Sequence, residues 1–339
     1  MENIKLSILK SVPDKFFTTS LAQIDHVFDG PTLLELEGRD KRPLFISTLI
    51  HGNETTSYYC LKTLLEVFRN RTLPRSLLIY IGNPVGAAKG LRILPGSPDL
   101  NRVWAGGEGA YEILSKQVFE YAKERNIFAN IDIHNNTGKN PFYACVNSLG
   151  SNFLYLASHF AKKVVYFTEP HTVQSMAFAK LAPSLVLECA QSGNSVAKEN
   201  CDRFIEWLIH LEEDPTSFEV PGDVEVFQTR ATITIPEDGL FDFDNNPSSD
   251  NDFSFITDLD QHNFRWVEVG TLLAQHTGSK KLIVTDRMGI DIGDGIFDYS
   301  DGKITTKHPI FPSMLTKDAA VAHSDCLGYI MEELNFKSI

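Results

Sequence analysis

The chain has 339 residues, which is enough for two domains with cores of their own. Its net charge of −13 argues against nucleic acid as a partner, because the phosphate backbone would be repelled. No run of about 18 apolar residues occurs, so we predict no membrane-spanning helix and no membrane partner.

The first two thirds of the chain alternate short apolar runs with helical stretches. The runs that predict strands are 32–36, 44–50, 77–81, 127–133, 163–167 and 184–188. The stretches that predict helices are 54–69, 109–125, 151–162 and 195–213. Several runs are apolar on both faces, as in strands that are covered by helices on both sides. Residues 1–214 are therefore predicted to form an α/β domain with a largely parallel or mixed sheet.

The pattern changes after Asp214-Pro215. Short β runs separated by turn residues follow at 231–235, 266–269, 281–285 and 302–306, and residues 317–335 look like a final helix. We predict a smaller, β-rich C-terminal domain over residues 215–339, with a terminal helix.

The termini and cysteines bear on the compartment. The start of the chain, Met1-Glu-Asn-Ile-Lys-Leu, lacks the layout of a secretory signal. The five cysteines are odd in number and scattered, with no C-x-x-C pair. We expect reduced thiols in a cytoplasmic protein.

His51 and Glu54 directly follow the apolar run 44–50, and His134 ends the run 127–133. Two imidazoles and a carboxylate are the ligands of many catalytic zinc sites, which keep a fourth position for water and lower its pKa to about 7. The ends of neighbouring strands form the edge at which ligands bind in open α/β sheets, so these side chains are expected to meet. The alternatives are a solvated loop for the first two residues and a strand-capping role for His134. Asp132 is a candidate to orient one histidine, or else a solvated or capping aspartate.

Glu188 is a carboxylate inside the apolar run 184–190. Burial of an unpaired charge is costly, so this side chain is expected to have a partner, such as a buried arginine, or to act as a general base. Arg92 and the run Asp99-Leu-Asn-Arg102 offer a cationic pocket, because an arginine grips a carboxylate with two hydrogen bonds. Asn101 could add an amide donor. The alternative is that these are surface arginines in a loop.

In this order, the motifs resemble those of the succinylglutamate desuccinylase/aspartoacylase family, a branch of the zinc carboxypeptidase-like (M14) metallohydrolases. The segments that carry the resemblance are His51-Gly-Asn-Glu54, Asn83-Pro84, Asp99-Leu-Asn-Arg102, Asp132-Ile-His-Asn135 and Leu187-Glu-Cys-Ala190. They fall within roughly residues 40–200.

The resemblance implies a zinc-carboxypeptidase-like mixed sheet flanked by helices, followed by a smaller β-rich domain. It implies one Zn²⁺ per chain, held by His51, Glu54 and His134. Glu188 would be the catalytic base toward the zinc-bound water, and Arg92 would polarise the scissile carbonyl. Asn101 and Arg102 would bind the α-carboxylate of the substrate. The implied reaction is hydrolysis of the amide bond of a small N-acyl amino acid.

The substrate and the class of reaction stay open. Aspartoacylases carry an arginine shortly before the catalytic glutamate, whereas Lys180 is the only cation in the corresponding stretch 175–183. A less acidic acyl-amino acid is therefore an alternative to N-acetylaspartate or succinylglutamate. A carboxypeptidase would use the same groups, and a metal-binding protein without catalysis would not need Glu188. Tyr299 could reach the site from the second domain, and a homo-oligomer is left open.

Overall fold

The computed structural model describes residues 4–244 and 250–336. Residues 1–3, which begin the N-terminal segment discussed above, lie outside the described residues. The chain forms two compact units. The first comprises residues 1–135 and 142–225, and the second comprises residues 136–141 and 226–339. The chain thus passes between units at Glu225, beyond the predicted boundary at 214/215, and one short internal segment joins the second unit.

The first unit is built on a mixed sheet with strand order β1-β2-β4-β3-β5-β8-β6-β7. The strands of this sheet are β1 (Ser7–Leu9), β2 (Thr32–Leu36), β3 (Gly38–Thr48), β4 (Leu73–Ile81), β5 (Ala129–His134), β6 (Phe142–Val146), β7 (Lys163–Tyr166) and β8 (Ser184–Cys189). The four central strands β4, β3, β5 and β8 are parallel. The strands β2 and β6 run antiparallel to their neighbours β4 and β8. The predicted α/β class is confirmed.

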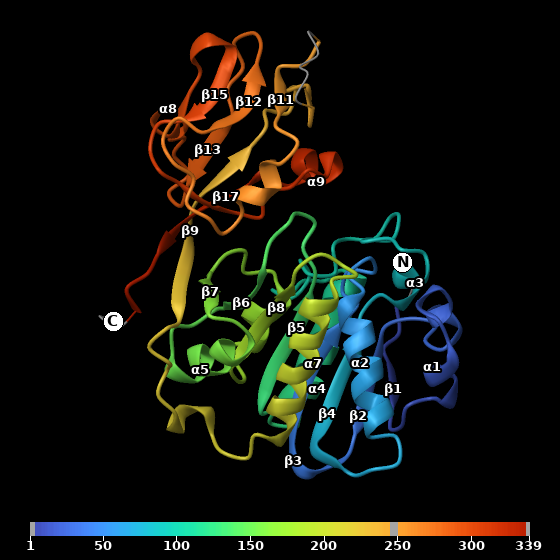
Figure 1. Cartoon of the computed structure of the whole chain (residues 1–339). Helices are drawn as coiled ribbons and strands as arrows, with labels where there is room; N and C mark the ends of the chain where they lie inside the picture. Colours follow the sequence, from blue (N-terminus) through green and yellow to red (C-terminus); the bar gives the residue numbers. More distant parts are fainter. Residues whose placement is uncertain (1–3, 245–249, 337–339) are drawn as a thin grey trace. The chain divides into compact units, whose positions relative to one another are not determined.

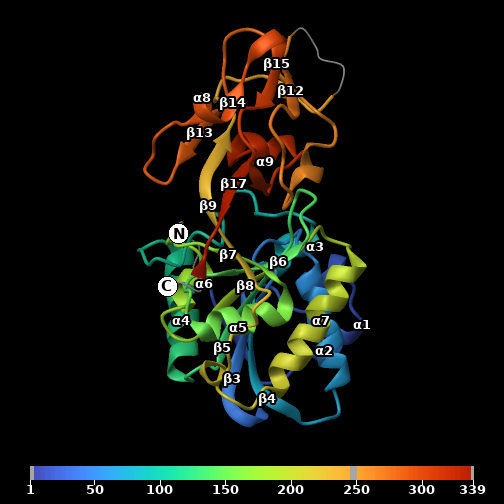
Figure 2. The ribbon, with the colours of Figure 1, turned by 60° about the vertical axis from the view of Figure 1, so that its left-hand side comes forward.

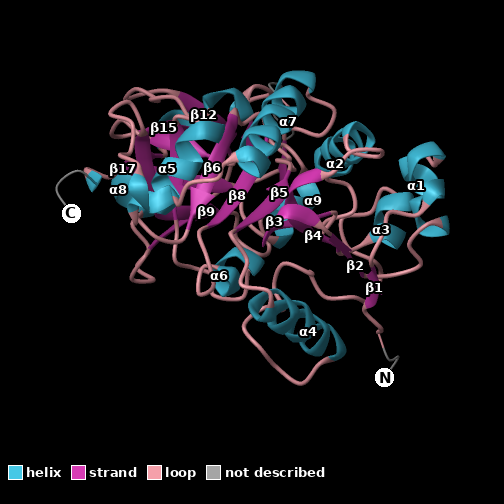
Figure 3. Cartoon of the chain, turned by 90° about the horizontal axis from the view of Figure 1, so that it is seen from below, coloured by secondary structure: helices cyan, strands magenta, loops and turns pink. Residues whose placement is uncertain are grey.

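Helices cover both faces of this sheet, as the doubly apolar strands require. Figure 3 shows α2, α5 and α7 on one face and α4 and α6 on the other. The helices of the first unit are α1 (Asp14–Thr18), α2 (Thr56–Val67), α3 (Pro84–Ala88), α4 (Ala110–Glu124), α5 (Ser151–Phe160), α6 (Gln174–Phe178) and α7 (Ser195–His210). The four helices predicted from periodicity correspond to α2, α4, α5 and α7, whereas the short β1 and β6 were not predicted.

One aromatic cluster shows how the helices are held on the sheet. Phe178, at the end of α6, is fully buried against Phe45 of β3, with their ring centroids 4.4 Å apart. It also makes edge contacts with Trp104 and with Phe119 of α4, both at 5.7 Å. Burial of this much aromatic surface fixes α4 and α6 against the strands that lead to the sheet edge.

The second unit contains paired strands and short helices (Figures 1 and 2). Four of the strands pair in the order β13-β9-β17-β16, and five others form a sheet of their own with the order β10-β11-β12-β15-β14. Its strands are β9 (Glu225–Thr234), β10 (Phe241–Asp242), β11 (Phe253–Phe255), β12 (Leu272–His276), β13 (Ile283–Asp286), β14 (Phe297–Asp298), β15 (Lys303–Thr306), β16 (Phe311–Ser313) and β17 (Gly328–Glu333). The two α-helices among its described residues are α8 (Gly293–Ile296) and α9 (Ala319–Ser324).

The predicted terminal helix over 317–335 is wrong. A single short helix, α9, is followed by the strand β17, which pairs between β9 and β16. A Cβ atom on Gly328 would come within 2.8–2.9 Å of Leu315, so the backbone approaches a neighbouring segment closely there. Ile330 and Met331 are buried in this sheet. Tertiary pairing therefore overrides the local helical pattern.

Two further expectations concern the thiols and the membrane. All five cysteines are free and buried, as predicted. Within residues 4–244 and 250–336, no helix is long and apolar enough to cross a bilayer.

Candidate functional site

Three parallel strands bring the predicted site residues to one edge of the first unit's sheet. Strands β3, β5 and β8 are adjacent, and their carboxyl ends lie at the same edge. In this register His134 is the partner of Glu188. Residues that are paired across neighbouring strands share a face, so these two side chains lie next to each other.

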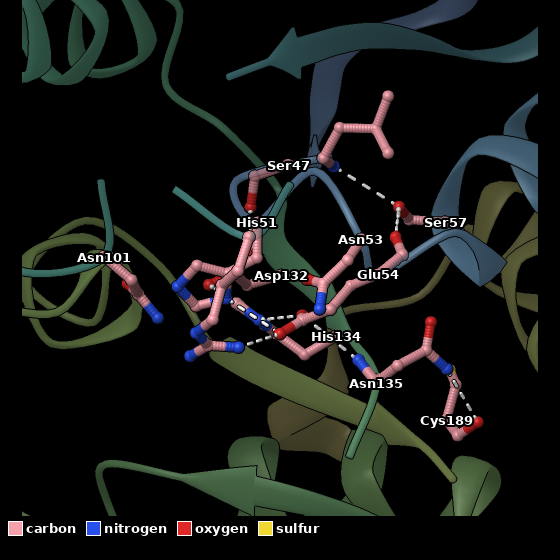
Figure 4. A network of polar contacts seen from close by, with 12 residues as sticks. Ser47, His51, Asn53, Glu54, Ser57, Asn101, Asp132, His134, Asn135 and Cys189 are labelled. Atoms are coloured by element: carbon pink, nitrogen blue, oxygen red, sulfur yellow. Dashed lines mark hydrogen bonds and ion pairs between the residues drawn. The ribbon is translucent and has the colours of Figure 1, made fainter. Parts of the chain in front are cut away.

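His51, Glu54 and His134 converge in a buried cluster (Figure 4). Nδ1 of His51 lies 2.9 Å from Oε1 of Glu54, and Nδ1 of His134 lies 2.8 Å from Oε2 of the same carboxylate. One potential ligand atom from each residue lies within 4.8 Å of the other two. Both imidazoles therefore direct the same kind of nitrogen toward one carboxylate.

Each histidine is held from behind by a second carboxylate. Nε2 of His51 lies 2.9 Å from Oδ1 of Asp99, and Nε2 of His134 lies 2.9 Å from Oδ2 of Asp132. Ser47 donates a hydrogen bond of 2.6 Å to the other oxygen of Asp132. Nε2 of His51 is hydrogen-bonded to its carboxylate, and Nε2 of His134 is ion-paired with its own. A proton on each Nε2 leaves the lone pair of each Nδ1 toward the cluster, which is the arrangement seen around metal-binding histidines.

The cluster fits a divalent cation. Two imidazole nitrogens and a carboxylate are the donor set of catalytic zinc sites. Nδ1 of His51 is buried and makes no hydrogen bond within the described part of the chain, although it faces Glu54. A cation would satisfy that atom, and it would balance the carboxylates that surround the histidines.

The electrostatics of the cluster point the same way. Burial lowers the pKa of His51, but Glu54 and Asp99 outweigh this effect and the pKa is raised. Burial also lowers the pKa of His134, but Asp132 and Glu54 raise it well above its ordinary value. Burial raises the pKa of Glu54, and the two histidines overcome that effect and hold it low. The site therefore favours positive charge at its centre, which is supplied by protons or by a metal that displaces them.

Glu188 has an unusual environment for a carboxyl group. Burial, with added repulsion from Glu54 and Asp132, raises its pKa to about 7, although His134 acts in the opposite direction. A carboxyl group with a pKa near neutrality can both accept and return a proton at physiological pH.

Arg92 reaches the cluster. Its guanidinium donates to Oε1 of Glu54. The main-chain carbonyl of Arg92 accepts hydrogen bonds from the amide of Asn83 and from Gly52 N–H, at 3.3 and 3.2 Å. A Cβ atom on Gly52 would lie 2.4–2.5 Å from the backbone of α3, so only glycine allows this close approach.

Asn101 and Arg102 are connected to the cluster by Asp99. The carboxylate of Asp99 accepts from the main-chain N–H of Asn101 at 2.7 Å, so one side chain contacts both His51 and the start of this pair. Figure 4 shows the Asn101 amide beside the cluster, and its Oδ1 accepts from Gln174 N–H at 2.9 Å. Arg102 is exposed, and its guanidinium donates to the carbonyl of Asn101 at 3.0 Å.

Several features of the site were not predicted. The pairing of Asp99 with His51 joins residues 48 positions apart, and only the spacing within Asp99-Leu-Asn-Arg102 hinted at a role for the aspartate. Ser47 carried no signal in the sequence. The hydroxyl of Tyr299 accepts from Leu282 N–H at 3.0 Å inside the second unit, and its approach to the site stays a prediction.

Comparisons with known proteins agree with this description. A family model of the succinylglutamate desuccinylase/aspartoacylase catalytic domain matches residues 40–206, a range that contains every residue of the cluster. No curated protein sequence matches the chain.

Solved structures share the fold at low identity. A succinylglutamate desuccinylase from Chromobacterium violaceum is 16% identical, with a TM-score of 0.53 over 88% of this chain and 87% of that chain. A succinylglutamate desuccinylase/aspartoacylase from Rhodobacter sphaeroides is 14% identical, with a TM-score of 0.58 over 88% of each chain. Murine aminoacylase 3 is 14% identical, with a TM-score of 0.52 over 88% of this chain and 97% of that chain. These structures show a shared fold, and the catalytic-domain match places residues 40–206 in the succinylglutamate desuccinylase/aspartoacylase family.

Proposed function

We propose that the protein is a zinc-dependent hydrolase that cleaves the amide bond of a small N-acyl amino acid. The observation that carries this proposal is the buried His51–Glu54–His134 cluster, in which each imidazole is held by a further carboxylate. That arrangement, beside a carboxyl group with a pKa near 7, combines a metal site with a base. Membership of a family of desuccinylases and aspartoacylases supports the same chemistry.

In the proposed centre, His51, Glu54 and His134 hold one Zn²⁺. When bound, zinc acts as a Lewis acid, and it makes water a stronger nucleophile at neutral pH. Asp99 and Asp132 keep both Nε2 atoms protonated, so that the Nδ1 atoms stay available as ligands.

Glu188 would act first as the general base and then as the general acid in this reaction. It accepts a proton from the attacking water as the new carbon–oxygen bond forms, and it passes that proton to the leaving nitrogen as the carbon–nitrogen bond breaks. The products are a carboxylate and a free amino acid. The position of Glu188 beside His134 in the strand register supports this role.

The arginines would bind and polarise the substrate. Asn101 and Arg102 would grip its α-carboxylate, since an amide and a guanidinium are suited to that group. Arg92, which lies against Glu54, would polarise the scissile carbonyl. Arg92 and Arg102 are assigned to the scissile carbonyl and the α-carboxylate, respectively. We therefore propose that the substrate has an uncharged side chain, in preference to N-acetylaspartate or succinylglutamate. Cytoplasmic localisation stays a prediction.

The first experiment combines metal analysis with a substrate panel. Zinc content is measured in wild type, His51→Ala and a matched histidine variant, His159→Ala. His159 is half-buried and stacks on Trp207 with ring centroids 3.8 Å apart, so its loss perturbs packing without touching the cluster. Each protein is then assayed with N-acetyl and N-succinyl amino acids of acidic and uncharged side chains, and with tri- and tetrapeptides.

We expect about one zinc per chain in wild type and His159→Ala and hydrolysis of N-acyl amino acids by both, with zinc and activity lost together in His51→Ala. Glu188→Gln should keep its zinc and lose turnover. Hydrolysis of the peptides instead would favour a carboxypeptidase. A wild type that binds no zinc when it is supplied would refute the proposal, and full turnover by Glu188→Gln would remove that residue from the mechanism.

A further inference from the structure

Asn135, the residue after His134, has a side chain that bonds to two segments far apart in the sequence. It is buried, and its amide nitrogen donates to the carbonyls of Cys189 and Ala190, both at 3.0 Å. The same nitrogen lies 2.9 Å from the hydroxyl of Thr56, so its two hydrogens are shared among three acceptors, and the amide oxygen accepts from Thr56 N–H at 3.1 Å. One side chain thus joins the start of α2 to the end of β8.

The second of these segments begins directly after Glu188. Cys189 is the last residue of β8, and Ala190 follows it with a φ of +50°. A left-handed conformation is unfavourable for alanine and persists only where surrounding contacts hold it. Two donated hydrogen bonds from Asn135 supply such contacts to the carbonyls on either side of this turn (Figure 4 shows Asn135 and Cys189 side by side).

The first segment carries Glu54. The main-chain N–H of Asn135 donates to Oε2 of Glu54 at 3.2 Å, and the side chain holds Thr56 two residues further on. The hydroxyl of Ser192 lies 3.2 Å from the amide oxygen of Asn135 and donates to the carbonyl of Asn53 at 2.9 Å, which closes the connection. Asn135 therefore bridges the two segments that carry Glu54 and Glu188.

We propose that Asn135 is a positioning residue that fixes the turn after β8 and thereby holds the Glu188 carboxyl group in place beside His134. This inference rests on the proposed function of Glu188 as the base. Asn135 itself would not contact the substrate. Its effect would come from geometry, because a displacement of about 1 Å in a reacting group can cost 10²-fold in rate.

The test uses two variants of the zinc-loaded, full-length protein. Asn135→Ala removes the whole bridge. Asn135→Asp has nearly the same shape and can accept from Thr56 N–H and Ser192, but its carboxylate cannot donate to Cys189 and Ala190. The control is Asn200→Ala. Asn200 lies in α7, is also buried, and donates to the carbonyl of Phe160 at 2.8 Å.

For each protein, kcat, KM, zinc content and melting temperature are measured on the N-acyl amino acid that wild type hydrolyses. We expect both Asn135 variants to lose about 10²-fold in kcat, with zinc content kept and KM little changed. Asn200→Ala should lose thermal stability and keep its kcat. A kcat near that of wild type in both Asn135 variants, or a loss that follows zinc content, would overturn the inference.

A readout that needs no activity separates this inference from the proposed function. Crystal structures of wild type and Asn135→Asp are compared at the end of β8. We expect the Ala190 turn to leave its left-handed conformation and the Glu188 carboxyl group to move relative to His134. An unchanged position of the Glu188 carboxyl group would overturn the inference, whether or not the protein is active. A wild type that hydrolyses no N-acyl amino acid would refute the proposed function and leave this structural comparison valid.

Discussion

Ionisation of Glu188 lowers the free energy of unfolding, and the substitution Glu188→Gln should reveal that cost. Its pKa rises from 4.5 to about 7, because the group is buried next to Glu54 and Asp132. Below pH 4.5 both the folded and the unfolded state are protonated, so the group contributes nothing. As the pH rises, only the unfolded state releases its proton, and the free energy of unfolding falls until the pH exceeds 7.

The full cost is about 3 kcal/mol, since each pKa unit corresponds to about 1.4 kcal/mol. Most of it develops between pH 5 and pH 8. Glutamine does not titrate, so metal-free Glu188→Gln should gain about 2–3 kcal/mol relative to wild type between these two pH values. The comparison across pH removes the pH-independent part of the substitution.

The assay is urea unfolding of the metal-free protein at pH 5 and pH 8, followed by tryptophan fluorescence. The three tryptophans are Trp104 and Trp207 in the first unit and Trp266 in the second, so a Trp266→Phe background reports on the first unit alone. Glu108→Gln, an exposed glutamate in the same unit, is the control. Equal differences between variant and wild type at both pH values would refute a raised pKa. Added zinc should reduce the effect, because a cation favours the carboxylate.

Three further predictions concern other parts of the first unit. Asp99→Asn should weaken zinc binding by about 10- to 100-fold, because His51 loses the carboxylate that orients it, and an unchanged affinity in competition with a chelator would contradict this role. Arg102→Lys should raise KM for the N-acyl amino acid by roughly tenfold at similar kcat, because lysine cannot form the bidentate contact, whereas steady-state kinetics with an unaltered KM would exclude it as the carboxylate binder. Phe178→Ala should lower the free energy of unfolding by about 3–5 kcal/mol in urea, because it empties a packed aromatic cluster. A loss below about 1 kcal/mol would mean that the site collapses around the cavity.

Much of the site could be predicted because its residues follow strongly apolar runs. The run 44–50 leads to His51, the run 127–133 ends at His134, and the run 184–188 ends at Glu188. Parallel strands align their carboxyl ends, so a local pattern at three separate places predicts one edge in space. The structure brings these residues together with Arg92, whose main-chain carbonyl is held by Asn83 and Gly52.

Predictions failed where a segment has no strong period of its own. Residues 317–335 contain enough helix-forming residues to suggest one helix, yet β17 forms because β9 and β16 are available on either side of it. The segment 136–141 joins the second unit although it follows directly on Asn135, and nothing in its composition indicates that.

The sequence by itself determined the α/β class, the positions of the long helices and the residues that meet at the sheet edge. These follow from hydrophobic periodicity and from the geometry of parallel strands, which are properties of short segments. Only the tertiary structure decided that Asp99 holds His51, and that Asn135 joins Thr56 to the turn after Glu188. Hydrogen bonds between side chains dozens of residues apart depend on register and packing to within an ångström, and local patterns do not carry that information.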